Sequence, residues 1–169
     1  MGGVFMVFNK AKLFSKTEAG REKICTISYD EKEEYYTFLK RAKNEGYRQI
    51  IVTSDIMVTI IRTMCLEKGF SVYKIELAEE DFEIEQEIDA LIDESQQDRI
   101  LFCNLLQKIE FLAEQSSIDF ARVYIKGKFA NGFTPNMFIQ ANGIMGVNVE
   151  SFEEITKIIS NVVEGCLFE

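Results

Sequence analysis

Apolar and polar residues alternate with clear periods over most of this chain, most plainly over residues 47–77. Residues 49–53, QIIVT, are a short apolar run of the kind found in strands that are covered on both faces. Ser54 and Asp55 are good N-caps for a helix over residues 54–68, because their side-chain oxygens accept from free backbone N–H groups. Residues 70–77 alternate again like a strand. A strand, a helix and a second strand in this order predict a right-handed parallel crossover.

Similar patterns predict the remaining elements. Strands are expected at residues 2–8, 23–29, 120–129 and 137–145, helices at 31–44 and 79–94, a loop or one frayed helical turn at 10–23, and a final helix capped by Ser151. The turn residues Gly132 and Pro135 lie between the last two strands, so we expect these strands to form an antiparallel hairpin.

Residues 99–103, RILFC, fit two patterns. As a helix, the segment would continue through apolar positions to residue 112. As a strand, it would open a second unit similar to residues 47–77, because RVYIK at 122–126 resembles SVYKI at 71–75. We prefer the strand, and this choice decides the expected number of strands.

We therefore expect an α/β fold with an open, mostly parallel sheet of about five to seven strands flanked by helices. An antiparallel hairpin near the C-terminus and a final helix complete it. Only one proline, Pro135, is present, and no Gly/Ser-rich linker divides the chain. Residues 1–169 are accordingly expected to form a single domain.

Charge is distributed unevenly along the sequence. The net charge of −9 argues against broad binding of nucleic acids or anionic membranes. Residues 1–48 nevertheless hold 10 basic against 7 acidic side chains, a net of +3, whereas residues 76–119 hold 2 basic against 14 acidic ones, a net of −12. Residues 120–134 hold 3 basic side chains and no acidic ones.

Composition excludes several chemistries. The chain has no histidine, which rules out Ser-His-Asp and Cys-His catalysis and His-containing zinc sites. No catalytic or cofactor-binding motif is present, so we assign no catalytic residue and expect no cofactor. The four cysteines occur singly within apolar runs, which is typical of reduced, mostly buried cysteines in a cytoplasmic protein. The apolar runs are far shorter than the ~18 residues of a membrane helix, so no membrane partner is expected.

The first candidate binding site is formed by Thr53, Ser54 and Asp55. At the carboxyl end of a parallel strand, beside a helix N-terminus, these hydroxyl groups would hold a phosphate or carboxylate. No glycine allows a ligand to approach the backbone, and Asp55 would repel an anion. A plain helix cap is therefore the competing interpretation.

The second candidate is a basic strip on the polar face of the strand 120–129, formed by Arg122, Lys126 and Lys128 with Tyr124 among them. Like charges on one strand face repel each other unless another group neutralises them. The acidic helix 79–94 is one source of neutralising carboxylates. Otherwise the strip is a surface for a nucleotide, a phosphate group or an acidic partner, on which Tyr124 is available to stack.

Two other segments carry weaker signals. Residues 140–146, QANGIMG, have Gly-x-x-Gly spacing but follow an antiparallel strand instead of opening a helix, so a turn or bulge is expected. The acidic block 76–98 lacks a calcium-loop pattern, so we expect no metal site and a solvated helix face. Its functional alternative is docking of a basic partner.

Two functions fit these observations. The first is a non-enzymatic cytoplasmic interaction or regulatory protein that binds a protein partner, or a second copy of itself, through an acidic helical face or a sheet edge. The second is a binder or enzyme for a small phosphorylated or nucleotide ligand, held between Thr53–Asp55 and the basic strip at the strand carboxyl ends. The second requires both features to meet in one pocket. We prefer the first, because catalytic motifs are absent and charge is strongly segregated.

Overall fold

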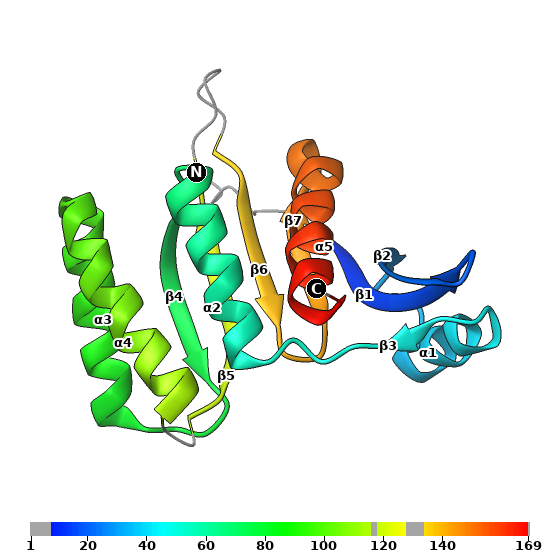
Figure 1. The fold of residues 1–169 in the computed structure, drawn as a ribbon, viewed down its shortest axis with the longest axis horizontal. Helices are drawn as coiled ribbons and strands as arrows, with labels where there is room; N and C mark the ends of the chain where they lie inside the picture. Colours follow the sequence, from blue (N-terminus) through cyan, green and yellow to red (C-terminus); the bar gives the residue numbers. More distant parts are fainter. Residues whose placement is uncertain (1–7, 116–117, 128–133, 169) are drawn as a thin grey trace.

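A computed structural model describes residues 8–115, 118–127 and 134–168. The described strands form one seven-stranded antiparallel sheet in the order β2-β1-β7-β6-β5-β4, with β3 paired to β1 (Figure 1). The strands are β1 (Phe8–Glu18), β2 (Arg21–Tyr29), β3 (Arg48–Gln49), β4 (Ser71–Leu77), β5 (Phe120–Lys126), β6 (Asn136–Gln140) and β7 (Ile144–Asn148). The helices are α1 (Tyr35–Asn44), α2 (Ser54–Arg62), α3 (Phe82–Gln97), α4 (Phe102–Gln115) and α5 (Phe152–Phe168).

The N-terminal part of the described chain is a β1–β2 hairpin. Its turn residues Ala19 and Gly20 have φ angles of 51° and 78°, as a two-residue hairpin turn of mirror-image type requires. The predicted loop at residues 10–23 is therefore wrong. Lysines at alternate positions concealed a strand whose Ala11 and Leu13 point into the core. The predicted strand 2–8 lies outside the described residues, except for Phe8.

The main hydrophobic core lies between one face of the sheet and the helices. Fully buried side chains from the strands, such as Val123 and Ile139, meet others from the helices, such as Ile60, Ile109 and Ile159. In Figure 1, α2 and α5 cross in front of the central strands, and α3 and α4 lie beside β4. Burial of these apolar surfaces is the main force that holds the helices on this face.

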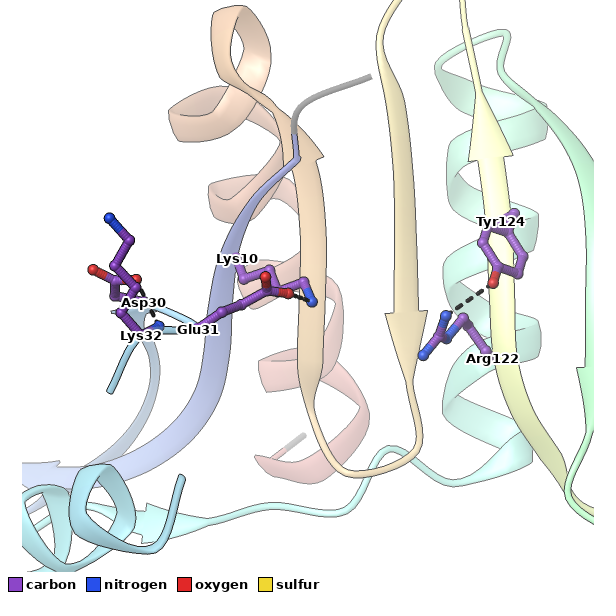
Figure 2. A network of polar contacts seen from close by, with 6 residues as sticks. All are labelled: Lys10, Asp30, Glu31, Lys32, Arg122 and Tyr124. Carbon is purple, nitrogen blue, oxygen red and sulfur yellow. Dashed lines mark hydrogen bonds and ion pairs between the residues drawn. The ribbon is translucent and has the colours of Figure 1, made fainter. Parts of the chain in front are cut away.

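The opposite face is covered only in part by the described helices. Phe14 points away from its neighbour Leu13, as consecutive strand residues do, and forms a second, smaller core with Phe38 and Ala42 of α1. This core lies at the β1–β2 end of the sheet. The other described helices, α2 to α5, contribute their buried side chains to the main core on the first face. We call the β4–β7 part of the second side, from which Arg122 and Tyr124 project in Figure 2, the open face.

The predicted mostly parallel sheet is wrong. Strand β3 contains only Arg48 and Gln49, pairs antiparallel with β1, and is separated from β4 by most of the sheet. The apolar run that follows β3 is irregular: Ile51 is 72% exposed, whereas Val52 is buried and donates its N–H to the Ala141 carbonyl. Helix α2 forms as predicted and continues into a π-helical turn, but the strands before and after it are not neighbours. The expected crossover therefore does not exist.

Residues 99–103 are helical, so the preferred strand and the proposed repeat are also wrong. The Asp98 side chain accepts from the N–H of Ile100 and starts a 3₁₀ turn, Arg99–Leu101, that leads directly into α4. Two C-terminal predictions are confirmed: β5 and β6 pair antiparallel, and α5 is the final helix. The predicted single strand 137–145 is wrong, because a turn at residues 141–143 divides it into the antiparallel strands β6 and β7. Residues 140–146 form the expected turn, with Gly143 at a φ of 85° between β6 and β7.

Candidate functional site

One row of side chains crosses the open face from strand to strand. Pairing aligns Lys10 with Gly146, then Gly146 with Phe138, Phe138 with Tyr124, and Tyr124 with Lys74. Residues that pair directly across antiparallel strands lie on the same face. The row therefore has two aromatic rings at its centre and a lysine at each end.

A β-bulge in β4 brings two consecutive residues to this face. The register shifts between Val72 and Lys74, and both Val72 and Ile75 are buried in the core. Tyr73 and Lys74, between them, therefore face outward together, which is how bulges redirect side chains near functional sites. The predicted strict alternation, which placed Tyr73 on the same side as Ile75, is wrong at this position.

Each cation near the centre of the open face lies against an aromatic ring. Lys126 Nζ is 5.4 Å from the ring centroid of Tyr73, and Lys74 Nζ is 5.5 Å from that of Tyr124. The Arg122 guanidinium carbon is 4.9 Å from the centroid of Phe138. Such contacts contribute about 0.5–1 kcal/mol each at exposed sites. We call this set the open-face patch: Tyr73, Lys74, Arg122, Tyr124, Lys126 and Phe138.

Glu76 neutralises part of the charge of the open-face patch. Its carboxylate oxygens lie 3.3 Å from Lys74 Nζ and 3.9 Å from Arg122 Nε. Arg122 also donates to the Tyr124 hydroxyl at 2.9 Å, which in turn donates to Glu76 at 3.2 Å; Figure 2 shows the Arg122–Tyr124 contact. These neutralising contacts come from the adjacent strand and not from the acidic helix that the sequence suggested. Three cations and one carboxylate leave the surface positive.

Lys126 forms no ion pair with a carboxylate in the described part of the chain. The Tyr73 ring beneath it is fixed by a hydrogen bond of 2.6 Å from its hydroxyl to Asn136 Oδ1. Burial raises the pKa of Tyr73, so its phenol is neutral at physiological pH. Lys128, the last residue of the predicted strip, lies outside the described residues.

Thr53, Ser54 and Asp55 lie on the other side of the sheet. Thr53 Oγ1 accepts from the N–H of Ile56 at 3.4 Å and caps α2. Ser54 is buried, and its hydroxyl accepts from the N–H of Phe120 at 3.0 Å. Because α2 packs on the core face and Arg122 and Tyr124 project from the open face (Figure 2), the two predicted features do not meet in one pocket.

A polar cavity of about 630 Å³ lies beside β1 near the open face. Two of its ion pairs join Lys10 to Glu31 (Figure 2) and Arg41 to Glu33 at 2.6 Å. Its remaining charged side chains, Asp30 and Lys32, add one negative and one positive charge. Balanced charge gives this cavity no preference for an anion.

Lys12 is fully buried beside the second core. Its ammonium group donates to the Asn142 carbonyl and lies 5.7 and 6.0 Å from the ring centroids of Phe14 and Tyr35. Burial lowers the pKa of Lys12 to about 8. Its one recorded hydrogen bond ties β1 to the β6–β7 turn, which is a structural role.

Three further sequence-based expectations concern metal-binding groups, membrane-spanning helices and the cysteines. Among the described residues, no three Cys, Asp or Glu side chains are grouped so as to hold a metal ion. No described helix combines the length and apolar character needed to cross a bilayer. The cysteines are free; burial raises the pKa of Cys65 to about 12, whereas Cys103 and Cys166 are exposed, so the expectation of burial is fully met only at Cys65.

Sequence reasoning found Arg122, Tyr124 and Lys126 but missed Tyr73, Lys74 and Phe138. The alternation in NMFIQ does separate Phe138 from its core neighbours, and that signal was available. The bulge has no comparable signal in the sequence.

Comparison with protein-family models gives no match, and neither the curated proteins nor the solved structures show significant similarity to this chain. Function must therefore be inferred from the residues themselves.

Proposed function

We propose that this chain is a non-enzymatic binding protein whose open-face patch holds a small nucleotide. The observation that carries the proposal is the set of three cations over three aromatic rings, only partly neutralised by the single carboxylate of Glu76. Phe138 is buried, so the partly exposed rings of Tyr73 and Tyr124 are the ones available for stacking. Aromatic rings stack on any base, and basic groups beside them attract the phosphate. The nucleotide site expected from the sequence is wrong, because Thr53–Asp55 and the basic strip do not meet in one pocket. The present proposal is a different one, in which the open-face patch alone forms the site.

The net charge favours a small ligand over a polymer. A long nucleic acid would extend past the patch and meet the field of a chain with a net charge of −9, whereas a mononucleotide interacts mainly with charges inside about one Debye length, roughly 8 Å at physiological salt. Local positive charge on an acidic protein therefore selects a compact anion.

Thermal unfolding with adenosine 5′-monophosphate (AMP) tests this proposal. Ligand at about a hundred times its Kd stabilises the folded state by about 2.7 kcal/mol, which raises Tm by several degrees. Tyr124→Leu removes the stacking ring and is expected to weaken binding about tenfold, whereas Tyr36→Phe, a control on the exposed surface of α1, leaves it unchanged. No shift with AMP, or tighter binding of a single-stranded oligonucleotide, would contradict the proposal.

The protein-interaction function remains a second candidate, favoured by exposed apolar residues on the acidic helices. Phe82 of α3 and Phe111 of α4 are 74% and 56% exposed, and Ile100 in the 3₁₀ turn between these helices is 78% exposed. The Lys108–Glu87 ion pair bridges the two helices. An apolar surface among carboxylates fits a basic, amphipathic protein partner. The sheet edges are less suitable, because Gln96 donates to the Val72 carbonyl of β4 and Glu164 accepts from the Ile24 N–H of β2.

Oligomeric state and partner capture at low and high salt test this candidate. A Phe82→Ser and Phe111→Ser double variant is expected to lose any self-association or partner capture seen with the native chain, while AMP binding is unaffected. A native chain that is strictly monomeric and captures no partner at low salt removes this candidate.

A further inference from the structure

A small cavity lies at the end of the open-face patch where β5 ends and β4 begins. Its volume is about 230 Å³, and it is lined by Gly69, Ser71, Lys126, Gly127 and Thr134. Two hydroxyl groups and one ammonium group supply donors, and none of these lining residues carries a carboxylate. This composition differs from that of the larger cavity beside β1, which is lined by three acidic side chains as well as three basic ones.

The two glycines give this cavity its shape. Gly69 has a φ of 75° with no atom near the position of a Cβ, so the backbone turns there without a side chain. At Gly127 a Cβ would lie 2.5 Å from the Phe70 ring, so only glycine allows the end of β5 to approach that ring. Gly127 is buried and its N–H donates to the Pro135 carbonyl, so Gly69 is the glycine that exposes backbone to the cavity. Backbone exposed by glycine, flanked by hydroxyl groups, is a common environment for phosphate oxygens.

Lys126 connects the cavity to the aromatic rings. It lines the cavity and also lies over the Tyr73 ring, whose centroid is 5.7 Å from that of Tyr124. Ser71 pairs directly with Lys126 across β4 and β5, so both side chains are on the open face. The neighbouring cations Lys74 and Arg122 already contact Glu76. Lys126 is therefore the basic group of the patch best placed to take up a new anionic partner.

We propose that the cavity formed by Gly69, Ser71, Lys126, Gly127 and Thr134 is the phosphate subsite of the open-face patch, and that it orients a nucleotide with its phosphate there and its base on Tyr73 and Tyr124. This inference rests on the proposed nucleotide function and adds the position of the phosphate. Ser71 and Thr134 donate hydroxyl hydrogen bonds, and Lys126 neutralises charge.

Affinities of the native chain and its variants for AMP, adenosine and inorganic phosphate test the inference. The Ser71→Ala and Thr134→Val double variant is expected to bind AMP about tenfold more weakly, because charge-assisted hydrogen bonds are lost, with adenosine affinity unchanged. Lys126→Met keeps the apolar stem and is expected to cause a similar loss. Lys157→Met, at an exposed position of α5, is the matched control and leaves affinity unchanged.

The outcomes separate this inference from the proposed function. Shifts of the Ser71, Lys126 and Gly127 amide NMR signals on addition of inorganic phosphate, together with the expected losses, support the subsite. AMP binding that is unchanged in the double variant and in Lys126→Met but weakened by Tyr124→Leu overturns the subsite and leaves the patch as the binding surface. A native chain that binds no AMP overturns both.

Discussion

The ring of Phe138 occupies the space that a side chain at Gly146 would need. A Cβ added to Gly146 would lie 2.3 Å from Phe138 Cε1, closer than carbon atoms approach. Because these residues pair directly across β6 and β7, the missing side chain lets the ring lie flat enough for the Arg122 guanidinium to rest over it. A glycine in the middle of a strand thus shapes the open face.

Gly146→Ala is expected to lower the free energy of unfolding by about 1–3 kcal/mol, because the added methyl group forces the Phe138 ring to move. Urea unfolding measures the effect. Adding Phe138→Leu should recover part of the loss, and the double-mutant cycle gives the coupling directly. Additive effects of the two substitutions would contradict the steric explanation.

Lys12 makes stability depend on pH. Its folded pKa of about 8 is below the ordinary value of 10.5, so folding favours the neutral amine. The unfolded chain then binds more protons between these values, and the free energy of unfolding rises as pH increases from about 8 towards 10.5. Below about pH 8 the cost of the buried charge is fully present.

Lys12→Met removes this titration and should raise the free energy of unfolding near neutral pH by about 1–3 kcal/mol, since a lowering of about 2.5 in pKa corresponds to roughly 3 kcal/mol and the bond to Asn142 is lost. The rise that Lys12 contributes above about pH 8 should be absent in the variant. A fall in stability towards higher pH should remain, because the raised pKa of Cys65 favours the folded state only while the unfolded thiol is protonated. Lys40→Met, at an exposed position of α1, is the control. A variant with the native slope would show that another group titrates.

Glu76→Gln is expected to strengthen AMP binding by about two- to fivefold, because Lys74 and Arg122 lose their carboxylate partner and meet the ligand instead. The gain should shrink at high salt. Calorimetric titration at two salt concentrations measures it, with Glu45→Gln on the exposed end of α1 as control. Weaker binding would mean that Glu76 contacts the ligand or holds Tyr124 in place.

Thr53→Ala is expected to lower the free energy of unfolding by about 0.5–2 kcal/mol through loss of the α2 cap, without changing AMP affinity. Thr53→Ser keeps the hydroxyl oxygen and should retain most of the stability. Loss of AMP affinity in a folded Thr53→Ala variant would return this position to the binding site.

Local signals in the sequence predicted local structure well. The NG turn and the helical period of α3 and α5 each depend on residues within one or two turns. The cap of α2 was placed one residue late, because Thr53 caps this helix instead of the expected Ser54 or Asp55. The pairing of strands that are far apart in the sequence does not depend on such nearby residues. QIIVT has the composition of a buried strand, yet its neighbours β1 and Ala141 are far away in sequence, and the chain gave no sign that it would run past the sheet edge with Ile51 in solvent.

The sequence identified the members of the open-face patch that lie on β5, where apolar and polar residues alternate regularly. The face of β5 followed from simple alternation, so Arg122, Tyr124 and Lys126 were identified together. Their partners on β4 and β6 depend on register, which is set by the turns and by the whole sheet. RILFC was misread because Asp98, one residue earlier, caps a helical turn that composition alone does not distinguish from a strand.

Because of the bulge in β4, the residues of this strand that face outward can change without a change in those that face the core. Val72 and Ile75 remain anchored in the core while the two residues between them are free to carry any chemistry. Removing one of the two would restore ordinary alternation and delete half of the ligand-facing edge without altering a single core side chain. Under the proposed function, a one-residue change in the length of β4 would therefore change which groups meet the ligand while the core side chains of this strand stay in place.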